Sequence, residues 1–287
     1  MKTIGTFIKD ILKGIVIGLA NVIPGVSGGT MMVVMGIYDK LIHCLSHFFK
    51  EFKKNILFLL PIIIGMLIAI FGGSVVIKWC FDRFPFPTTL FFIGLILGGL
   101  PMMVGKVKGN KIRFGHLIAF ALFFALVIAM ALLSGMSGQE AVLTTKPLSL
   151  LLLFLVGVVA AGTMVIPGVS GSLVLLILGY YNPVIGTISQ FMSALKGGDK
   201  ELLLQSFVIL LVFGVGVLVG IVGFAKLIEM IFQKFELYAY WAIIGLIVAS
   251  PIGILMMANF GVLTVGPVLV GVVCLVVGCL IAYKLGG

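Results

Sequence analysis

The chain has 287 residues, of which 62% are hydrophobic and only 10% are charged, and its mean hydropathy is +1.34. This composition excludes an ordinary soluble domain, in which about a quarter of the residues are charged. The net charge of +10 does not indicate nucleic-acid binding, because the basic residues stand in short loops between apolar runs, where they orient a membrane protein and contact anionic lipid. We expect an all-α polytopic membrane protein, since lipid offers backbone groups no partners and β-barrel alternation is absent.

The first membrane segment, residues 14–42, is interrupted by ANVIPGVSGGTMM at residues 20–32. Pro removes a backbone donor and Gly permits conformations that helices do not use, so this sequence predicts a break. The basic residues that flank the segment are Lys2, Lys9 and Lys13 before it and Lys50, Lys53 and Lys54 after it. Both flanks are cytoplasmic under the positive-inside rule. We therefore expect a re-entrant hairpin of two half-helices rather than a simple span.

Three apolar runs follow, at residues 55–77, 89–104 and 115–134. With their flanks they approach the ~20 residues that cross a hydrocarbon core. The loop after the second run contains Lys106, Lys108, Lys111 and Arg113. No acidic residue accompanies them, which marks this loop as cytoplasmic.

The second half repeats this order. The sequence TMVIPGVSGSLVL at residues 163–175 repeats VIPGVSG letter for letter and interrupts the segment 149–187. Apolar runs then follow at residues 203–226, 238–258 and 264–284. Because each half has an odd number of spans after its hairpin, the second half is expected to lie upside down relative to the first.

Residues outside the motif also match at one constant spacing. Gly65, Gly72, Phe81 and Phe84 pair with Gly216, Gly223, Phe232 and Phe235, and GLI at 94–96 pairs with GLI at 245–247. We therefore expect a single membrane domain, residues 1–287, made of two inverted repeats, residues 1–143 and 144–287. Each repeat would contain a re-entrant broken-helix hairpin and three transmembrane helices. Secondary transporters use this plan and bind substrate where the broken helices meet.

The same arrangement predicts the orientation of the chain. It places the N-terminus and the C-terminus in the cytoplasm, together with most of the basic residues. The basic residues left on the outer side are Lys78, Arg83, Lys146, Lys196 and Lys200.

The paired breaks predict a site for an anion. Glycines let successive backbone N–H groups point into one concavity, and hydroxyls add donors, with Ser27 placed to cap the half-helix after it. The expected phosphate-binding residues are Gly25, Ser27, Gly28, Gly29 and Thr30 in the first break and Gly168, Ser170, Gly171 and Ser172 in the second. A helix end stabilises an anion by about 0.3–1 kcal/mol, whereas burying an ion costs several. Hydrogen bonds of roughly 1.5–3 kcal/mol each must therefore carry the binding.

Other polar residues border the breaks. Asn21, opposite Met164 in the second copy, either coordinates a coupling cation or caps a helix end, and Thr163 is a second candidate for ion coordination or polar lining. A proton or a sodium ion is the expected coupling ion. Tyr38 and Tyr181 follow the two breaks and are typical of interfacial anchors.

Other motifs lack the partners that their chemistry requires. GVSGG fits a hydrolase nucleophile elbow, but an activated Ser needs a nearby base, and His43, His47 and His116 all stand at predicted membrane edges. His43 and His47 stand four residues apart, a spacing at which a helix presents two ligands to one metal ion. No third ligand is evident in the sequence, which favours a polar helix face at the membrane surface. We expect no enzyme activity, no cofactor and no bound metal.

The extended sequences ANVIPGVSGGTMMVVMGIYDKLI and TMVIPGVSGSLVLLILGYYNPVI resemble the signature of the bacterial polyprenyl-phosphate transporter family. The resemblance covers essentially the whole chain. It implies a flippase of the bacterial cytoplasmic membrane that returns undecaprenyl phosphate from the outer to the inner leaflet, recycling the lipid carrier for cell-wall synthesis. The family motif corresponds to Asn21, Pro24, Gly25, Ser27, Gly28, Gly29 and Thr30, and to Pro167, Gly168, Ser170, Gly171 and Ser172.

The partners that the resemblance implies are undecaprenyl phosphate or a related polyprenyl phosphate and the surrounding membrane lipids, with no nucleic acid. Two other functions remain as alternatives. One is a membrane lipid-phosphate phosphatase, which requires acid and base residues that the motif does not contain. The other is a transporter of a small soluble anion. The second copy of the motif ends in GS where the first ends in GGT, so the two breaks need not bind equally.

Overall fold

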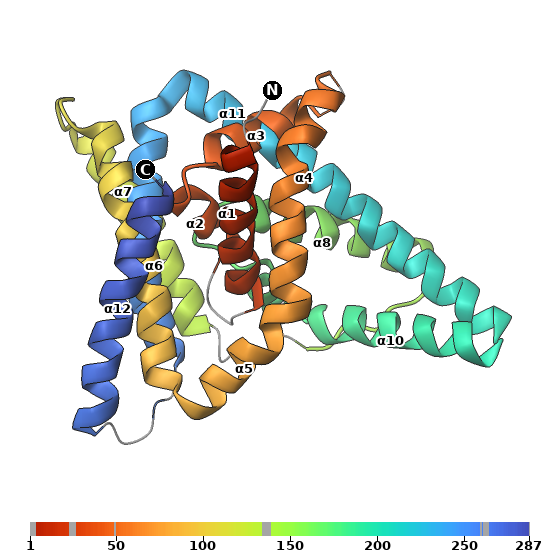
Figure 1. Ribbon diagram of the computed structural model, residues 1–287. Helices are drawn as coiled ribbons and strands as arrows, with labels where there is room; N and C mark the ends of the chain where they lie inside the picture. Colours follow the sequence, from red (N-terminus) through yellow and green to blue (C-terminus); the bar gives the residue numbers. More distant parts are fainter. Residues whose placement is uncertain are drawn as a thin grey trace.

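The structure, a computed structural model, describes residues 4–22, 27–48, 50–133, 139–258, 260 and 264–286. Every regular element in these ranges is a helix (Figure 1). The elements are α1 (Ile4–Val22), α2 (Gly28–Val34), α3 (Tyr38–Ser46), α4 (Phe52–Ile68), the π-helical η1 (Ala69–Gly73), α5 (Ser74–Arg83), α6 (Pro85–Val107), α7 (Phe114–Leu133), α8 (Pro147–Val165), α9 (Gly171–Ile177), α10 (Tyr181–Gly197), α11 (Lys200–Met257) and α12 (Val265–Gly286). The expectation of an all-helical, multi-pass membrane protein is confirmed.

Within the described ranges, six helices are long and apolar enough to cross a membrane. Four of them, α4 with η1, α6, α7 and α12, coincide with expected spans. The helix α8 also qualifies, although its segment was expected to form only a hairpin. The two runs 203–226 and 238–258 both lie within α11, where they form two helical stretches separated by a kink at Phe235. The two expected runs are therefore separate helical stretches, as the sequence predicts.

The bend in α11 has a counterpart in the first half. Phe235 is the residue of α11 with non-helical dihedral angles, φ −136° and ψ 44°. Phe84, its partner in the sequence comparison, lies between α5 and α6 with φ −138° and ψ 59°. Pro85 follows Phe84 and has no N–H to continue a helix, whereas Glu236 has one. The same turn therefore separates two helical stretches in each half.

Helices approach most closely where glycines cross. Gly65 of α4 lies against the carbonyl oxygen of Ile11 in α1, and Gly216 of α11 lies against the carbonyl oxygen of Phe154 in α8. Neither position has room for a Cβ atom, which is how small residues let membrane helices pack. Gly65 and Gly216 are matched in the sequence, so α1 with α4 and α8 with α11 form equivalent crossings.

A second pair of crossings joins the two halves. Gly94 of α6 lies against the carbonyl oxygen of Leu275 in α12, and Gly245 of α11 lies against that of Phe120 in α7. Gly94 and Gly245 again occupy matched positions. In each of these two crossings, one helix therefore comes from the first half of the chain and the other helix comes from the second half.

The first interrupted segment folds back on itself. Asn21, near the end of α1, lies against Gly28 at the start of α2. Further back in α1, Lys13 donates from Nζ to the carbonyl oxygen of Met35, just after α2, at 2.5 Å. The helices α1 and α2 therefore run in opposite directions, and Gly36, with φ +67°, turns the chain into α3.

The second interrupted segment folds back in the same way. Gly171, at the start of α9, lies against Ala160 and Met164 near the end of α8. Before α8, the N–H of Ala141 donates to the carbonyl oxygen of Gly179, after α9, at 3.0 Å. The helix α9 therefore returns toward the start of α8, and the chain then bends by 103° into α10.

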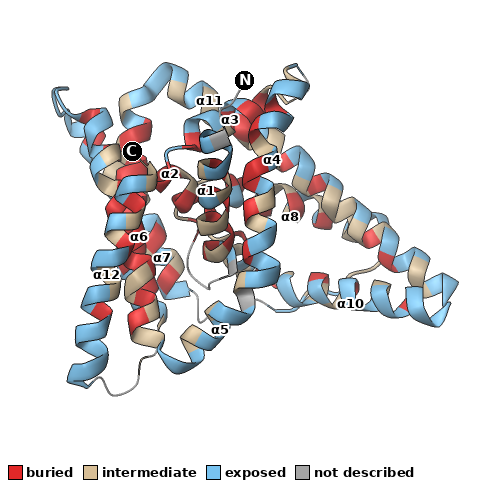
Figure 2. Cartoon of the chain, in the orientation of Figure 1, coloured by how far each residue is buried: buried red, intermediate tan, exposed pale blue. Residues whose placement is uncertain are grey.

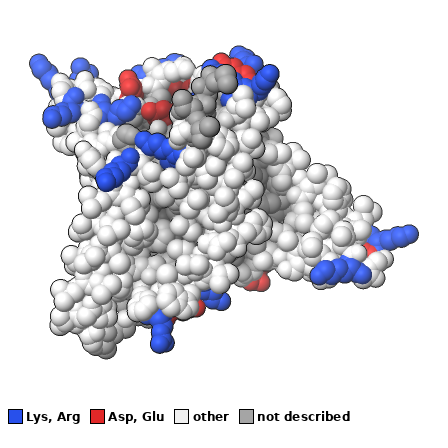
Figure 3. Space-filling view, in the orientation of Figure 1, with Lys and Arg blue, Asp and Glu red and all other residues white. Residues whose placement is uncertain are grey.

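The charged residues separate into distinct regions of the surface. Figure 1 places the start of α1 and the end of α12 near the same, upper face, whereas the stretch before α8 lies low in the view. Most Lys and Arg side chains visible in Figure 3 gather on the upper face, with smaller groups at α5 and at the tip where α10 meets α11. Figure 2 shows the buried residues concentrated in the centre and the outer faces of α10 and α12 exposed. The exposed face of α12 is almost entirely apolar, as contact with lipid requires, whereas α10 also exposes polar residues such as Ser189 and Gln190.

Candidate functional site

The two interrupted helices meet at their breaks, which we call the two corners, residues 27–30 and 166–172. The N–H of Gly168 donates to Thr30 Oγ1 at 2.7 Å, across 138 positions of sequence. A Cβ atom on Gly29 would come within 3.2 Å of the Cα atom of Pro167. The corners therefore touch, and they do so because position 29 carries no side chain.

The first corner is held by the core of the molecule. Thr30 is 1% exposed. The next residue, Met31, and Val34 at the end of α2 are fully buried in a cluster with Phe92 of α6 and Ile247 of α11. The helix α2 is thus fixed by apolar packing on several sides, and this packing positions the polar residues at its start.

The serines of the two corners occupy equivalent positions. Ser27 and Ser170 each precede a helix of 7 residues and have extended dihedral angles, φ −90° and ψ 126° for Ser27 and φ −98° and ψ 118° for Ser170. Neither side chain accepts a capping hydrogen bond, so the expectation that Ser27 caps α2 is wrong. Ser170 Oγ instead lies 3.0 Å from Ser172 Oγ. Both helices are short, so their dipoles are weak. An anion placed here would be stabilised mainly by hydrogen-bond donors.

The expected site residues differ in exposure. Ser27, Gly28, Gly29, Thr30 and Gly171 are buried, Gly168, Ser170 and Thr163 are half-buried, and Asn21 and Ser172 are exposed. Gly25 and Pro24 lie outside the described residues. Thr163 Oγ1 donates to the carbonyl oxygen of Ala160 at 2.7 Å, so its hydroxyl proton is already engaged within α8.

A small cavity opens beside the second corner, between α7, the break and α11. Gly168, Ser170 and Ser250 line it together with apolar residues, and its volume is about 20 Å³. This is room for about one water molecule and too little for a phosphate group. A group the size of phosphate would fit here only if the helices that line the cavity moved apart.

Three polar residues near the corners were missed or misjudged from the sequence. Ser250 lines the cavity. The sequence feature that could have identified it is a hydroxyl side chain next to Pro251 within an apolar run. Lys13 is 8% exposed, so a cation is buried in the first hairpin. Tyr38 is 4% exposed and donates to the carbonyl oxygen of Val165 at 3.0 Å. The expectation that Tyr38 anchors the chain at the membrane surface is therefore wrong, because its hydroxyl instead links α3 to the end of α8.

The contact between the corners leads to a prediction about stability. We expect Thr30→Val to lower the free energy of unfolding by about 1–3 kcal/mol, because the N–H of Gly168 loses its acceptor while the side-chain shape is kept. Thr30→Ser retains the oxygen and is the matched control. The unfolding temperature of the purified variants in detergent measures the difference. An unchanged value for Thr30→Val would contradict the hydrogen bond described above.

Comparison with known proteins gives two similar chains. The first is a polyprenyl-phosphate transporter of Staphylococcus aureus, 32% identical over 245 residues, which cover 84% of this chain and 83% of the relative. The second is a polyprenyl-phosphate transporter of Vibrio cholerae, 28% identical over 249 residues, which cover 80% of this chain and 71% of the relative. No solved structure matches the chain significantly.

Both relatives are named as transporters, which confirms the expectation that the chain is not an enzyme. The profile of the undecaprenyl phosphate translocase-like family matches residues 17–265, which include both corners and all helices from α2 to α11. The resemblance noted in the sequence is thereby confirmed: the chain belongs to the undecaprenyl phosphate translocase-like family.

Proposed function

We propose that the chain transports polyprenyl phosphate, moving undecaprenyl phosphate from the outer to the inner leaflet of the bacterial cytoplasmic membrane for reuse in cell-wall synthesis. The names of the relatives support the substrate class. The observation that carries the proposal is the contact between the corners, Gly168 to Thr30. A headgroup held there would meet donors from both halves of the chain.

In this proposal the phosphate takes hydrogen bonds from the hydroxyls and backbone N–H groups of the two corners. The proposed binding residues are Gly25, Ser27, Gly28, Gly29, Thr30, Gly168, Ser170, Gly171 and Ser172. Charge-assisted bonds of this kind contribute roughly 1.5–3 kcal/mol each, so a few of them offset the several kcal/mol that burial of an ion costs. The isoprenoid tail stays in the bilayer, so the protein needs no cavity for the tail.

We also propose that the two halves are inverted repeats and that both hairpins are re-entrant. The folding back of α1 on α2 and of α8 on α9 supports this, as do the matched glycine crossings and the matched bends at Phe84 and Phe235. The gathering of basic residues near both chain ends favours a cytoplasmic position for that face. A site between the two repeats is then reached alternately from each leaflet.

Transport in this scheme requires the corners to open. The cavity of about 20 Å³ beside Ser170 holds no headgroup, so the structure corresponds to a closed state of the proposed cycle. Phe84 and Phe235 are the proposed hinges, because each is a single residue with non-helical dihedral angles between two helical stretches. Hinges of this kind absorb the backbone rotation while packed helices move as units.

A coupling ion would find one polar group before each corner. The Asn21 amide lies against Gly28, and Thr163 retains its oxygen lone pairs after donating to Ala160. We propose these two residues as polar lining that a proton carrier or a sodium ion contacts. The membrane lipids around the outer faces are the other partners.

The direct test is leaflet exchange in reconstituted vesicles. Purified protein is expected to move undecaprenyl phosphate between leaflets, and an imposed proton or sodium gradient is expected to change the rate. Inorganic phosphate in place of the lipid separates this proposal from a transporter of soluble anions, and free phosphate release from undecaprenyl pyrophosphate would indicate a phosphatase. Equal exchange in protein-free vesicles would rule the proposal out.

A further inference from the structure

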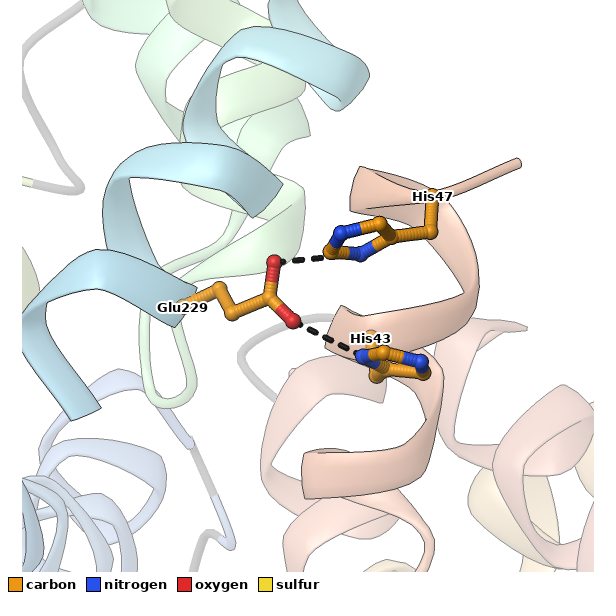
Figure 4. Close-up of side chains that lie close together, drawn as sticks. All are labelled: His43, His47 and Glu229. Atoms are coloured by element: carbon orange, nitrogen blue, oxygen red, sulfur yellow. Dashed lines mark hydrogen bonds and ion pairs between the residues drawn. The ribbon is translucent and has the colours of Figure 1, made fainter. Parts of the chain in front are cut away.

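A second polar cluster lies on the face that holds the chain ends, at the contact of α3 with α11. His43 and His47 project from one face of α3, and Glu229 reaches toward both rings from α11 (Figure 4). His43 Nδ1 lies 2.8 Å from Glu229 Oε1, and His47 Nδ1 lies 3.4 Å from Glu229 Oε2. The two rings stack with centroids 4.7 Å apart. The fold thus supplies the third group that the two histidines lacked in the sequence.

We propose that His43, His47 and Glu229 bind one divalent transition-metal ion, for which Zn²⁺ is the best fit. Their potential ligand atoms lie within 4.8 Å of one another. Imidazole nitrogens at about 2.0–2.1 Å and a carboxylate oxygen at about 2.0–2.2 Å around a tetrahedral zinc ion stand roughly 3.3–3.5 Å apart. Of the two His–Glu separations, 3.4 Å lies within this range and 2.8 Å lies about half an ångström below it. Small side-chain rotations are therefore enough to admit the ion.

The chemistry of the cluster suits a metal better than an isolated ion pair. A neutral imidazole binds a metal through the ring nitrogen that carries no proton. As the residues stand, His43 Nδ1–H donates to Glu229 Oε1, and a bound metal ion would replace this proton and take the Nδ1 lone pair. Ser46 Oγ donates to the carbonyl oxygen of His43 at 3.0 Å and lies 2.9 Å from His47 Nδ1, so it orients this end of α3.

His47 and Glu229 line a cavity of about 440 Å³ together with Lys50 and Lys226, so an ion held by the three residues would lie beside this cavity. His43, His47 and Glu229 have exposed side-chain fractions of 47%, 33% and 16%, so an ion reaches the cluster from solution. The two ammonium groups repel any cation here, the proposed ion included, so the ion would need an anionic fourth ligand such as hydroxide to balance the charge. An ion held here would tie α3 to α11, which belong to the two different halves of the chain.

The test is zinc binding by the full chain, purified in detergent without a histidine tag. After dialysis against Zn²⁺ and removal of free metal, we expect one Zn²⁺ per chain by elemental analysis. His43→Ala with His47→Ala is expected to reduce retention to background, and Glu229→Gln to weaken it at least tenfold. Glu236→Gln removes the same charge elsewhere on α11 and is expected to leave the stoichiometry at one. This measurement does not involve transport, so its outcome is independent of the proposed function.

A measurement on the unmodified protein covers the case in which the histidine variants fail to fold. X-ray absorption at the zinc edge is expected to report two imidazole ligands and one carboxylate. Retention of less than a tenth of an equivalent by the unmodified chain would overturn the proposal. A bound zinc ion without imidazole ligands, or one retained by the double histidine variant, would overturn it as well.

Discussion

Replacing Ser27 and Ser170 together by Ala is expected to reduce the affinity for the polyprenyl-phosphate headgroup by about 100-fold or more. Two charge-assisted hydrogen bonds of roughly 1.5–3 kcal/mol each are lost, and each 1.4 kcal/mol corresponds to about a factor of ten. The two residues hold matching positions on the two corners, and neither side chain caps its helix. The fold therefore does not depend on these hydroxyls, and the variant is expected to remain stable. Binding of undecaprenyl phosphate to the purified variant measures the effect.

The control for this experiment is Ser189→Ala. Ser189 is exposed on α10 and donates to the carbonyl oxygen of Ile185 within the same helix, so its loss is expected to leave binding and leaflet exchange unchanged. Each single corner variant is expected to lie between the control and the double variant. A double variant that binds as tightly as the unmodified chain would remove the corners from the proposed site.

Gly216→Leu is expected to destabilise the protein severely, by about 3 kcal/mol or more. The first side-chain atom would meet the carbonyl oxygen of Phe154, which is backbone and cannot rotate away. The helices α8 and α11 would have to separate along their crossing, and α8 carries the second corner at its end. We therefore expect low yield of folded protein and a large fall in the unfolding temperature.

Gly214→Leu is the matched control, because Gly214 lies in the same helix with no atom within 4 Å of its would-be Cβ atom. Both changes add the same side chain and the same gain in helix propensity over Gly, up to about 1 kcal/mol. The difference between the two variants therefore isolates the crossing with α8. Similar unfolding temperatures for the two would contradict the close approach described above.

Much of the fold follows from signals that are local in sequence. Apolar runs near the length of a membrane crossing predict α4, α6, α7 and α12 because lipid leaves the backbone no alternative to a helix. The breaks in the two VIPGVSG copies follow from Pro and Gly in the same way. The kink between the runs 203–226 and 238–258 lies at one residue, Phe235, with no Pro or Gly beside it, so its exact position was not predictable.

The arrangement of the site depends on packing between distant segments. The sequence identified both corners by their repetition, but the hydrogen bond from Gly168 to Thr30 arises only when α2 and α8 are brought together. Glu229 meets His43 across 186 positions of sequence, a separation at which no local spacing rule could have identified it. The direction in which the Ser27 hydroxyl points was misjudged for the same reason, because local capping preference competes with the packing of the whole corner.

The central claim is that both corners hold one phosphate group together. An experimental structure of the chain with undecaprenyl phosphate bound in a lipid nanodisc tests it most directly. The account predicts the phosphate between Ser27 and Ser170, with Thr30 and Gly168 further apart than in the closed state. A phosphate located instead at the basic loop that contains Lys111 and Arg113, with the corners still in contact, would contradict it.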